Sequence, residues 1–149
     1  MIEASADGEY WIIWQLMALC GLRSVEAVNL TYGDIDLERR LIHVGKTSSN
    51  SGKSRTVIYP ECLQEVIEEQ LDRHRHLYRK NEHNYFIAGW WSPLSTRAVR
   101  YAFQKYSDMA GIEGYSPHSL RHFYAESLVR KGVDLDTIRK NLGVSILTI

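Results

Sequence analysis

The spacing of apolar residues changes twice along this chain, and that change limits the folds open to it. Apolar side chains recur at helical intervals over residues 9–19, and Gly21 follows as a plausible helix end. Between residues 34 and 59 they occur instead in short runs rich in β-branched residues, and after Pro60 the helical interval returns. The order predicts one α+β domain that is mainly helical, with a small three-stranded antiparallel sheet in its N-terminal third.

Helix-capping and helix-ending residues set the expected limits of each element. Ser24 and Ser95 are predicted N-caps, and Pro117 is expected to open a helix. The three β runs are expected to form a meander, with a long flexible hairpin between the second and third strands. The predicted helices cover residues 9–19, 24–29, 61–79, 95–109, 117–132 and 134–142, and the predicted strands cover residues 34–37, 41–44 and 56–59.

Length and composition are those of a single globular domain. The chain has 149 residues, of which 44% are apolar and 24% charged, which excludes a disordered or low-complexity protein. The longest apolar stretch, residues 11–22, contains Gln15 and is too short to cross a bilayer, so no membrane partner is expected. No signal peptide is visible, and Cys20 and Cys62 are expected to be buried, reduced thiols. These features predict a cytoplasmic protein.

Net charge gives no direct sign of a partner, because 18 basic residues balance 18 acidic ones. Affinity for nucleic acid depends on where positive charge lies as well as on its sum. Acidic residues concentrate in residues 61–69, while basic residues concentrate around the predicted hairpin and again in residues 121–131. This distribution permits one basic face on a neutral body.

Two patterns that suggest a nucleotide or a metal site are incomplete. The Gly-Lys-Thr and Gly-Lys-Ser tripeptides at 45–47 and 52–54 lack the first glycine of a phosphate-binding loop and the helix that should follow it. His118 and His122 have the spacing of a zinc-binding pair, but Ser119 stands where a zinc protease needs glutamate, and no third ligand is obvious. No metal and no cofactor are therefore expected.

The basic residues that remain suit the chemistry of a phosphodiester. Arg23 lies at the junction of the first two predicted helices. His118 and Arg121 are three residues apart and share one face of a predicted helix, with Leu120 and Phe123 turned toward the core. Two arginines can donate forked hydrogen bonds to the non-bridging oxygens of one phosphate and stabilise its pentavalent transition state. A lysine on the hairpin can protonate a leaving oxygen.

Four sequence boxes follow one another along the chain. They are Gly-Leu-Arg-Ser-Val-Glu at 21–26 with Leu-Thr-Tyr-Gly-Asp-Ile at 30–35, Gly-Lys at 45–46, Pro-His-Ser-Leu-Arg-His at 117–122, and Asn-Leu-Gly at 141–143. In this order the boxes resemble the catalytic domain of the tyrosine recombinases of the phage integrase family. The resemblance runs over nearly the whole chain and implies that family's small three-stranded sheet within a mainly helical domain.

The resemblance implies a role for each matched residue. Arg23 would be the first catalytic arginine, with Glu26 as its structural partner. Arg121 would hold the scissile phosphate from the other side, and His118 would assist proton transfer. His122 matches a position that is commonly polar in the family and is interpreted as structural support.

The hairpin and the strand after it supply the other basic residues of the predicted site. Lys46 directly follows the second strand, as in the family pattern, and would be the general acid for the 5′-hydroxyl. Lys53 remains the alternative for that role. The residues expected to bind DNA are Arg23, Lys46, Lys53, Arg55 and Arg121.

The sequence departs from the family pattern in two places. Val144 stands where the family usually has a histidine that hydrogen-bonds to the scissile phosphate, and valine offers no such bond. The nucleophilic tyrosine normally comes several residues later, and no tyrosine up to Ile149 is a good candidate. Residues 1–149 are therefore expected to form one catalytic domain that lacks the N-terminal core-binding domain and the C-terminal tyrosine segment.

The implied function is cleavage and rejoining of double-stranded DNA in site-specific recombination or integration, through a 3′-phosphotyrosyl intermediate. The isolated chain is expected to be inactive and monomeric, and the full-length protein to form a tetramer on DNA. One alternative is a DNA-binding relative that does not catalyse cleavage. Another is a helix-turn-helix regulator, because residues 137–149 also resemble the turn of that motif. A type IB topoisomerase and a protein-interaction module are further alternatives.

Overall fold

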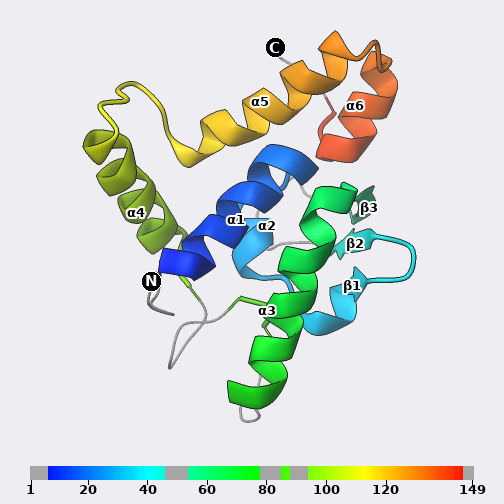
Figure 1. The fold of residues 1–149 in the computed structure, drawn as a ribbon. Helices are drawn as coiled ribbons and strands as arrows, with labels where there is room; N and C mark the ends of the chain where they lie inside the picture. Colours follow the sequence, from blue (N-terminus) through cyan, green and yellow to red (C-terminus); the bar gives the residue numbers. More distant parts are fainter. Residues whose placement is uncertain (1–6, 46–53, 78–84, 88–93, 146–149) are drawn as a thin grey trace.

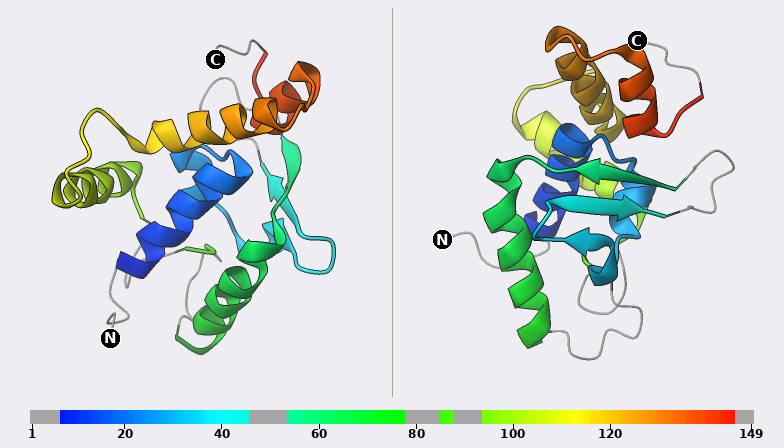
Figure 2. Two further views of the ribbon diagram at one scale, coloured as in Figure 1. Left: turned by 45° about the horizontal axis from the view of Figure 1, so that its top comes forward. Right: turned by 90° about the vertical axis from the view of Figure 1, so that its right-hand side faces the viewer.

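The computed structural model describes residues 7–45, 54–77, 85–87 and 94–145, which form helices around one small sheet. Helix α1 lies in the middle of the molecule, with α4 on one side and α3 and the sheet on the other, and α5 crosses over it (Figures 1 and 2). The predicted fold class, mainly helical with a three-stranded antiparallel sheet, is confirmed. The helices are α1 (Asp7–Cys20), α2 (Ser24–Val28), α3 (Gln64–Leu77), α4 (Thr96–Met109), α5 (Pro117–Arg130) and α6 (Leu135–Leu142).

The sheet has the strand order β1-β2-β3, and each neighbouring pair is antiparallel. The strands are β1 (Ile35–Asp36), β2 (Leu41–Val44) and β3 (Arg55–Ile58). Side chains alternate between the two faces, so Val57 points into the core while Thr56 is exposed beside His43, whose Nδ1 lies 2.9 Å from Thr56 Oγ1. Arg55 has the same parity as Val57, and its side chain is therefore turned into the protein.

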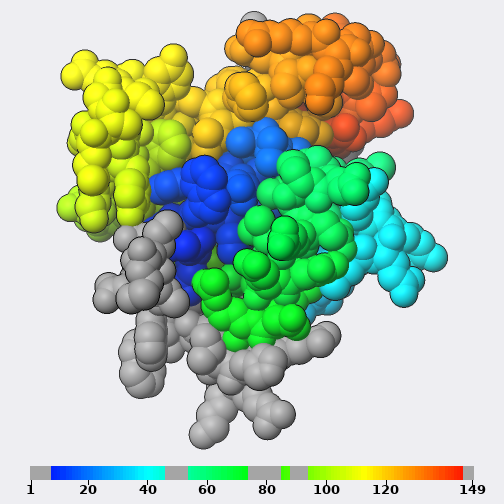
Figure 3. All heavy atoms as spheres, in the orientation of Figure 1, coloured from blue at the N-terminus to red at the C-terminus, as the bar shows by residue number. Residues whose placement is uncertain are grey.

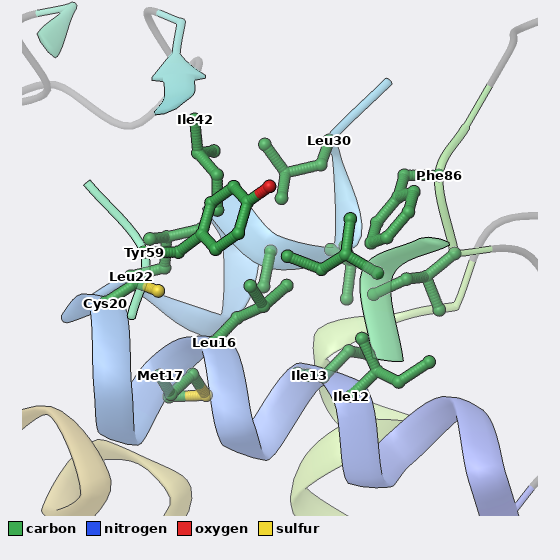
Figure 4. Close-up of a cluster of buried hydrophobic side chains, with 14 of the residues drawn as sticks. Ile12, Ile13, Leu16, Met17, Cys20, Leu22, Leu30, Ile42, Tyr59 and Phe86 are labelled. Carbon is green, nitrogen blue, oxygen red and sulfur yellow. The ribbon is translucent and has the colours of Figure 1, made fainter. Parts of the chain in front are cut away.

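The main apolar core lies between α1, α2, the sheet and α3 (Figure 4). Along α1 the side chains of Ile13, Leu16 and Met17 follow helical spacing and are at most 1% exposed. Ile42 from β2 and Tyr59, just after β3, cover them from the sheet. Burial of a large apolar side chain contributes roughly 1.5–3 kcal/mol, which makes this cluster the main source of stability for the domain.

A second, smaller apolar cluster joins α5 to α6 and consists mainly of Tyr124, Ala125, Ile138 and Leu142. It meets the main core at Gly21, where φ is +69° and an added Cβ would come within 2.6 Å of Tyr124 Cε1. Only glycine permits both that backbone conformation and that close approach. The space-filling view shows α5 and α6 as a layer over α1 (Figure 3).

The helices begin and end within about three residues of the predicted limits. Ser95 Oγ accepts a hydrogen bond from the Ala98 amide at 3.1 Å, and Gly143 adopts φ +64° directly after α6. The predicted N-cap Ser24 is wrong: Arg23 occupies the cap position, and Ser24 is the first residue of α2. The side chain of Glu26 accepts the backbone N–H of Arg23 at this helix start.

Two predictions of burial are also wrong. Phe123 is 54% exposed, because the inward face of α5 is carried by Arg121, Tyr124 and their neighbours, and Phe123 lines an apolar groove of about 540 Å³ between α1, α4 and α5. Cys62 is exposed, because the single 3-10 turn Glu61–Leu63 directs Leu63 inward and leaves the cysteine outside.

Some predictions fall outside the described residues. They concern the hairpin segment 46–53 and the last two residues of the expected helix 61–79. Across the parts of the chain that the structure describes, no helix is both long enough and apolar enough to cross a membrane.

Candidate functional site

The carboxylate of Glu26 lies at the centre of the predicted site. Its side chain is 1% exposed, in α2. Oε2 accepts the backbone N–H of Arg23 at 2.7 Å, and Oε1 lies 3.1 Å from Arg23 Nη1. A glutamate three residues after the cap position commonly accepts that amide, so the Arg-Ser-Val-Glu sequence fixes the start of α2 and holds Arg23 in place.

Arg55 binds the same carboxylate from β3. Its Nη1 donates to Glu26 Oε1 at 2.8 Å and its Nη2 donates to Oε2 at 2.9 Å, while its Nε donates to the backbone oxygen of Asn141 at 2.6 Å. The side chain is 7% exposed. A forked contact of this kind combines charge with fixed geometry, and here it connects α2, β3 and the end of α6.

Arg121 reaches the same place from the first half of α5. Its Nη1 donates to the backbone oxygen of Gly21 and its Nη2 to that of Leu142, both at 2.6 Å. Its Nη1 is 3.9 Å from Glu26 Oε2, which is too long for a hydrogen bond. The two carbonyls stand at the C-terminal ends of α1 and α6, where the helix dipoles are negative, so partial charges hold the arginine there without a hydrogen-bonded carboxylate.

Positive charge exceeds negative charge in this cluster, since three guanidinium groups surround one carboxylate. Burial raises the pKa of Glu26, but the hydrogen bonds from Arg55 and Arg23 outweigh it, and the pKa lies below its usual value. Burial, followed by the charge of Arg23, lowers the pKa of Arg121 to about 10. Both groups are charged at neutral pH, so the cluster can receive an anion.

His118 lies in the first turn of α5, beside the arginines. Partial burial lowers its pKa most, followed by the charges of His122, Arg121 and Arg23, which places the ring within the field of the cluster. Its ring meets that of His122 edge to face, with centroids 4.7 Å apart. Among the described residues, no group of three or more His, Cys, Asp or Glu side chains is placed to hold a metal ion.

The structure brings together Arg23, Arg55, His118 and Arg121. Lys46 and Lys53 lie outside the described residues. Val144 packs against the α5–α6 cluster, and its backbone N–H donates to Arg139 O at 3.2 Å.

The part that Arg55 takes in the cluster was missed in the sequence. Its parity with Val57 along β3 is the signal that could have revealed an inward-facing arginine.

The sequence model described as "Phage integrase family" matches residues 2–148. The chain belongs to the phage integrase family. The match includes most of residues 137–149, so this segment is part of the integrase domain and not a separate helix-turn-helix motif. In the structure, α6 packs on α5 and supplies the Leu142 oxygen that binds Arg121.

Named relatives agree with this placement. The chain is 36% identical to tyrosine recombinase XerA of Thermococcus kodakarensis over 141 residues, which is 92% of this chain and 47% of that protein. A crystal structure of XerA recombinase superposes with a TM-score of 0.80 at 28% identity, over 96% of this chain and 50% of that one. The fold is shared with XerH bound to palindromic difH in a post-cleavage complex, with a TM-score of 0.78 at 24% identity over 97% of this chain and 42% of that one. The chain thus spans about half the length of the relatives it matches.

Proposed function

We propose that this chain is the catalytic domain of a tyrosine site-specific recombinase, which cleaves and rejoins double-stranded DNA through a 3′-phosphotyrosyl intermediate. The observation that carries the proposal is the convergence of Arg23 and Arg121 on one buried carboxylate, with positive charge in excess. The name of the relative in Thermococcus kodakarensis, a tyrosine recombinase, supports the same assignment.

Each residue of the site would have a distinct task. Arg23 and Arg121 would donate hydrogen bonds to the non-bridging oxygens of the scissile phosphate and stabilise the charge of the transition state. His118, whose pKa is lowered, would be neutral at pH 7 and able to exchange a proton. Lys46 is proposed as the general acid for the 5′-hydroxyl, with Lys53 as the alternative.

The attacking tyrosine is proposed to lie outside these 149 residues. Tyr124 is the tyrosine of the α5–α6 cluster, and its side chain is 8% exposed and packed against Gly21, so its hydroxyl is unsuited to in-line attack. The resemblance supports a tetramer of full-length protein on DNA and a monomeric isolated domain.

A DNA-binding relative that does not cleave is the second candidate. The observation that favours it is Val144, an apolar side chain packed against α5 and α6 at the position of the usual second histidine. Such a site would still bind a phosphate through its arginines, but it would have one fewer donor for the transition state.

The test is formation of a covalent protein–DNA complex by the full-length protein on a nicked duplex that traps the cleaved strand, measured by denaturing gel. Arg23→Ala is expected to lower the rate of complex formation about 10²–10³-fold, the usual effect of losing one transition-state donor. Arg130→Ala is the control, since the Arg130 side chain is 79% exposed and its ion pair with Glu126 is 3.8 Å long. An undiminished rate for Arg23→Ala would contradict the proposal, and a wild-type protein that binds DNA without forming the complex would favour the second candidate.

A further inference from the structure

We propose that Arg55 is a positioning residue that neutralises Glu26 and thereby leaves Arg23 and Arg121 free to bind phosphate. The proposal rests on the function proposed above for the same site and assigns Arg55 a task other than contact with DNA. It explains why a site for an anion has a carboxylate at its centre. Glu26 holds the start of α2 in place through the Arg23 amide, and Arg55 cancels the charge that Glu26 brings with it.

The distances around Glu26 show which arginine satisfies it. Arg55 makes both of the guanidinium contacts shorter than 3 Å, one to each carboxylate oxygen. Arg23 makes one longer contact at 3.1 Å through Nη1, and Arg121 stays 3.9 Å away. The forked geometry uses the carboxylate fully, so the other two arginines need not turn toward it.

Removal of Arg55 would change the balance of charge at the site. Glu26 would remain a buried carboxylate that lacks its forked partner, and buried charges without partners are strongly unfavourable. Arg121 Nη1 is near enough that a small rotation would carry it from Gly21 O to Glu26 Oε2. An incoming phosphate would then compete with the Glu26 carboxylate for hydrogen bonds from Arg23 and Arg121.

Arg55 is poorly placed to bind DNA itself. All three of its nitrogens donate within the protein, two of them to the buried carboxylate of Glu26. Arg121 is equally buried, with a 6% exposed side chain, but it donates only two of its five N–H groups, to uncharged carbonyl oxygens. A guanidinium that makes these contacts would have to leave a buried carboxylate in order to reach a backbone phosphate.

The end of α6 is built around Arg55. The backbone oxygens of two consecutive residues, Asn141 and Leu142, accept from Arg55 and from Arg121 respectively. Gly143 follows with φ +64°, and an added Cβ would lie 3.1 Å from both Cδ and Nη1 of Arg55. Two adjacent carbonyls thus set the two buried guanidinium groups side by side, and the glycine makes room for one of them.

The experiment measures binding of the 149-residue chain to a fluorescein-labelled 20-base-pair duplex by anisotropy, across a series of salt concentrations. Arg55→Met is expected to weaken binding about tenfold and to reduce the slope of log K against log salt by about 1, as if one phosphate contact were lost. The double variant Arg55→Met/Glu26→Gln removes the carboxylate together with its counterion. It is expected to bind at least about threefold more tightly than Arg55→Met and to recover the slope.

The control is Arg55→Met/Glu61→Gln, which has the same net charge as the rescued variant. Glu61 has a 92% exposed side chain, so its loss is expected to leave the tenfold weakening in place. A purely structural role for Arg55 would lower the melting temperature and leave the salt slope of the folded protein unchanged. Melting curves are recorded for every variant, so that binding is compared below each transition.

Each outcome decides the proposal. If Arg55→Met does not fold, Arg55→Lys and the rescued double variant are compared with wild type, and weakening of both by more than about tenfold overturns the proposal. Equal binding by Arg55→Met and the rescued variant also overturns it. Failure of the wild-type chain to bind duplex DNA would contradict the proposed function itself, which distinguishes that failure from failure of this inference.

Discussion

Replacement of Glu26 by alanine is predicted to be among the most damaging single changes in this domain. The carboxylate is 1% exposed and accepts from Arg23 N at 2.7 Å, from Arg23 Nη1 at 3.1 Å and from Arg55 at 2.8 and 2.9 Å. Its loss leaves buried guanidinium groups without a counterion, and breaking a buried pair in this way costs about 3–5 kcal/mol. For a domain whose total stability is roughly 5–15 kcal/mol, Glu26→Ala should lower the melting temperature by on the order of 10 °C.

The assay is urea unfolding followed by circular dichroism, with Glu61→Ala as the matched control. Glu61 has a 92% exposed side chain, and its ion pair with Arg40 is 4.0 Å long, so its loss should leave the unfolding free energy close to that of wild type. A loss of less than about 1 kcal/mol in Glu26→Ala would refute the reasoning, because it would mean that the arginines do not depend on this carboxylate.

The pH dependence gives a second check of the same prediction. The folded-state pKa of Glu26 is lowered, so its contribution to stability is complete above its ordinary value of 4.5 and is lost as the pH falls through the lowered folded-state value. The difference in unfolding free energy between wild type and Glu26→Ala should therefore be largest at neutral pH and shrink in acid. A difference that grew as the pH fell would contradict the assigned sign.

Two further predictions concern stability. Gly21→Ala should cost at least about 2 kcal/mol more than Gly111→Ala. Both glycines have φ near +70°, but an added Cβ at Gly21 would lie 2.6 Å from Tyr124, whereas one at Gly111 would have no described atom within 4 Å. Equal losses of stability in thermal unfolding would contradict this. Burial raises the pKa of Glu9 to about 7, although the charge of Arg73 opposes the shift. The contribution of the neutral carboxyl to the unfolding free energy is therefore complete below pH 4.5 and is lost as the pH rises through 7. Glu9→Gln should therefore raise the unfolding free energy at about pH 8 and have little effect at about pH 4. An equal effect at both pH values would argue against it.

Helices and strands were predictable where one residue carries the signal. Ser95 and Gly143 act as a cap and as a left-handed helix end, and both roles follow from their own chemistry. Phe123 was not predictable in the same way. Apolar spacing tells which side chains share a helix face, but it does not tell whether another element covers that face.

The site was predictable to the extent that it depends on matched motifs. Arg23, His118 and Arg121 lie together, as their boxes predicted. The partners of Arg55 are 29 and 86 residues away in the sequence, at Glu26 and Asn141, and contacts over such separations do not follow from local patterns. The expected roles of Lys46 and Lys53 remain predictions.

Arg121 holds the C-terminal ends of α1 and α6 together, and this affects what the same arginine indicates in a related sequence. Active-site residues often reduce stability in exchange for activity, so they tend to be lost once activity is no longer selected. Here the guanidinium joins Gly21 O to Leu142 O across the boundary between the two apolar clusters, so it also stabilises the fold. A descendant without the proposed strand cleavage would still gain stability from these two hydrogen bonds. The presence of this arginine in a related sequence is therefore evidence of the same helix arrangement, whether or not the proposed activity is retained.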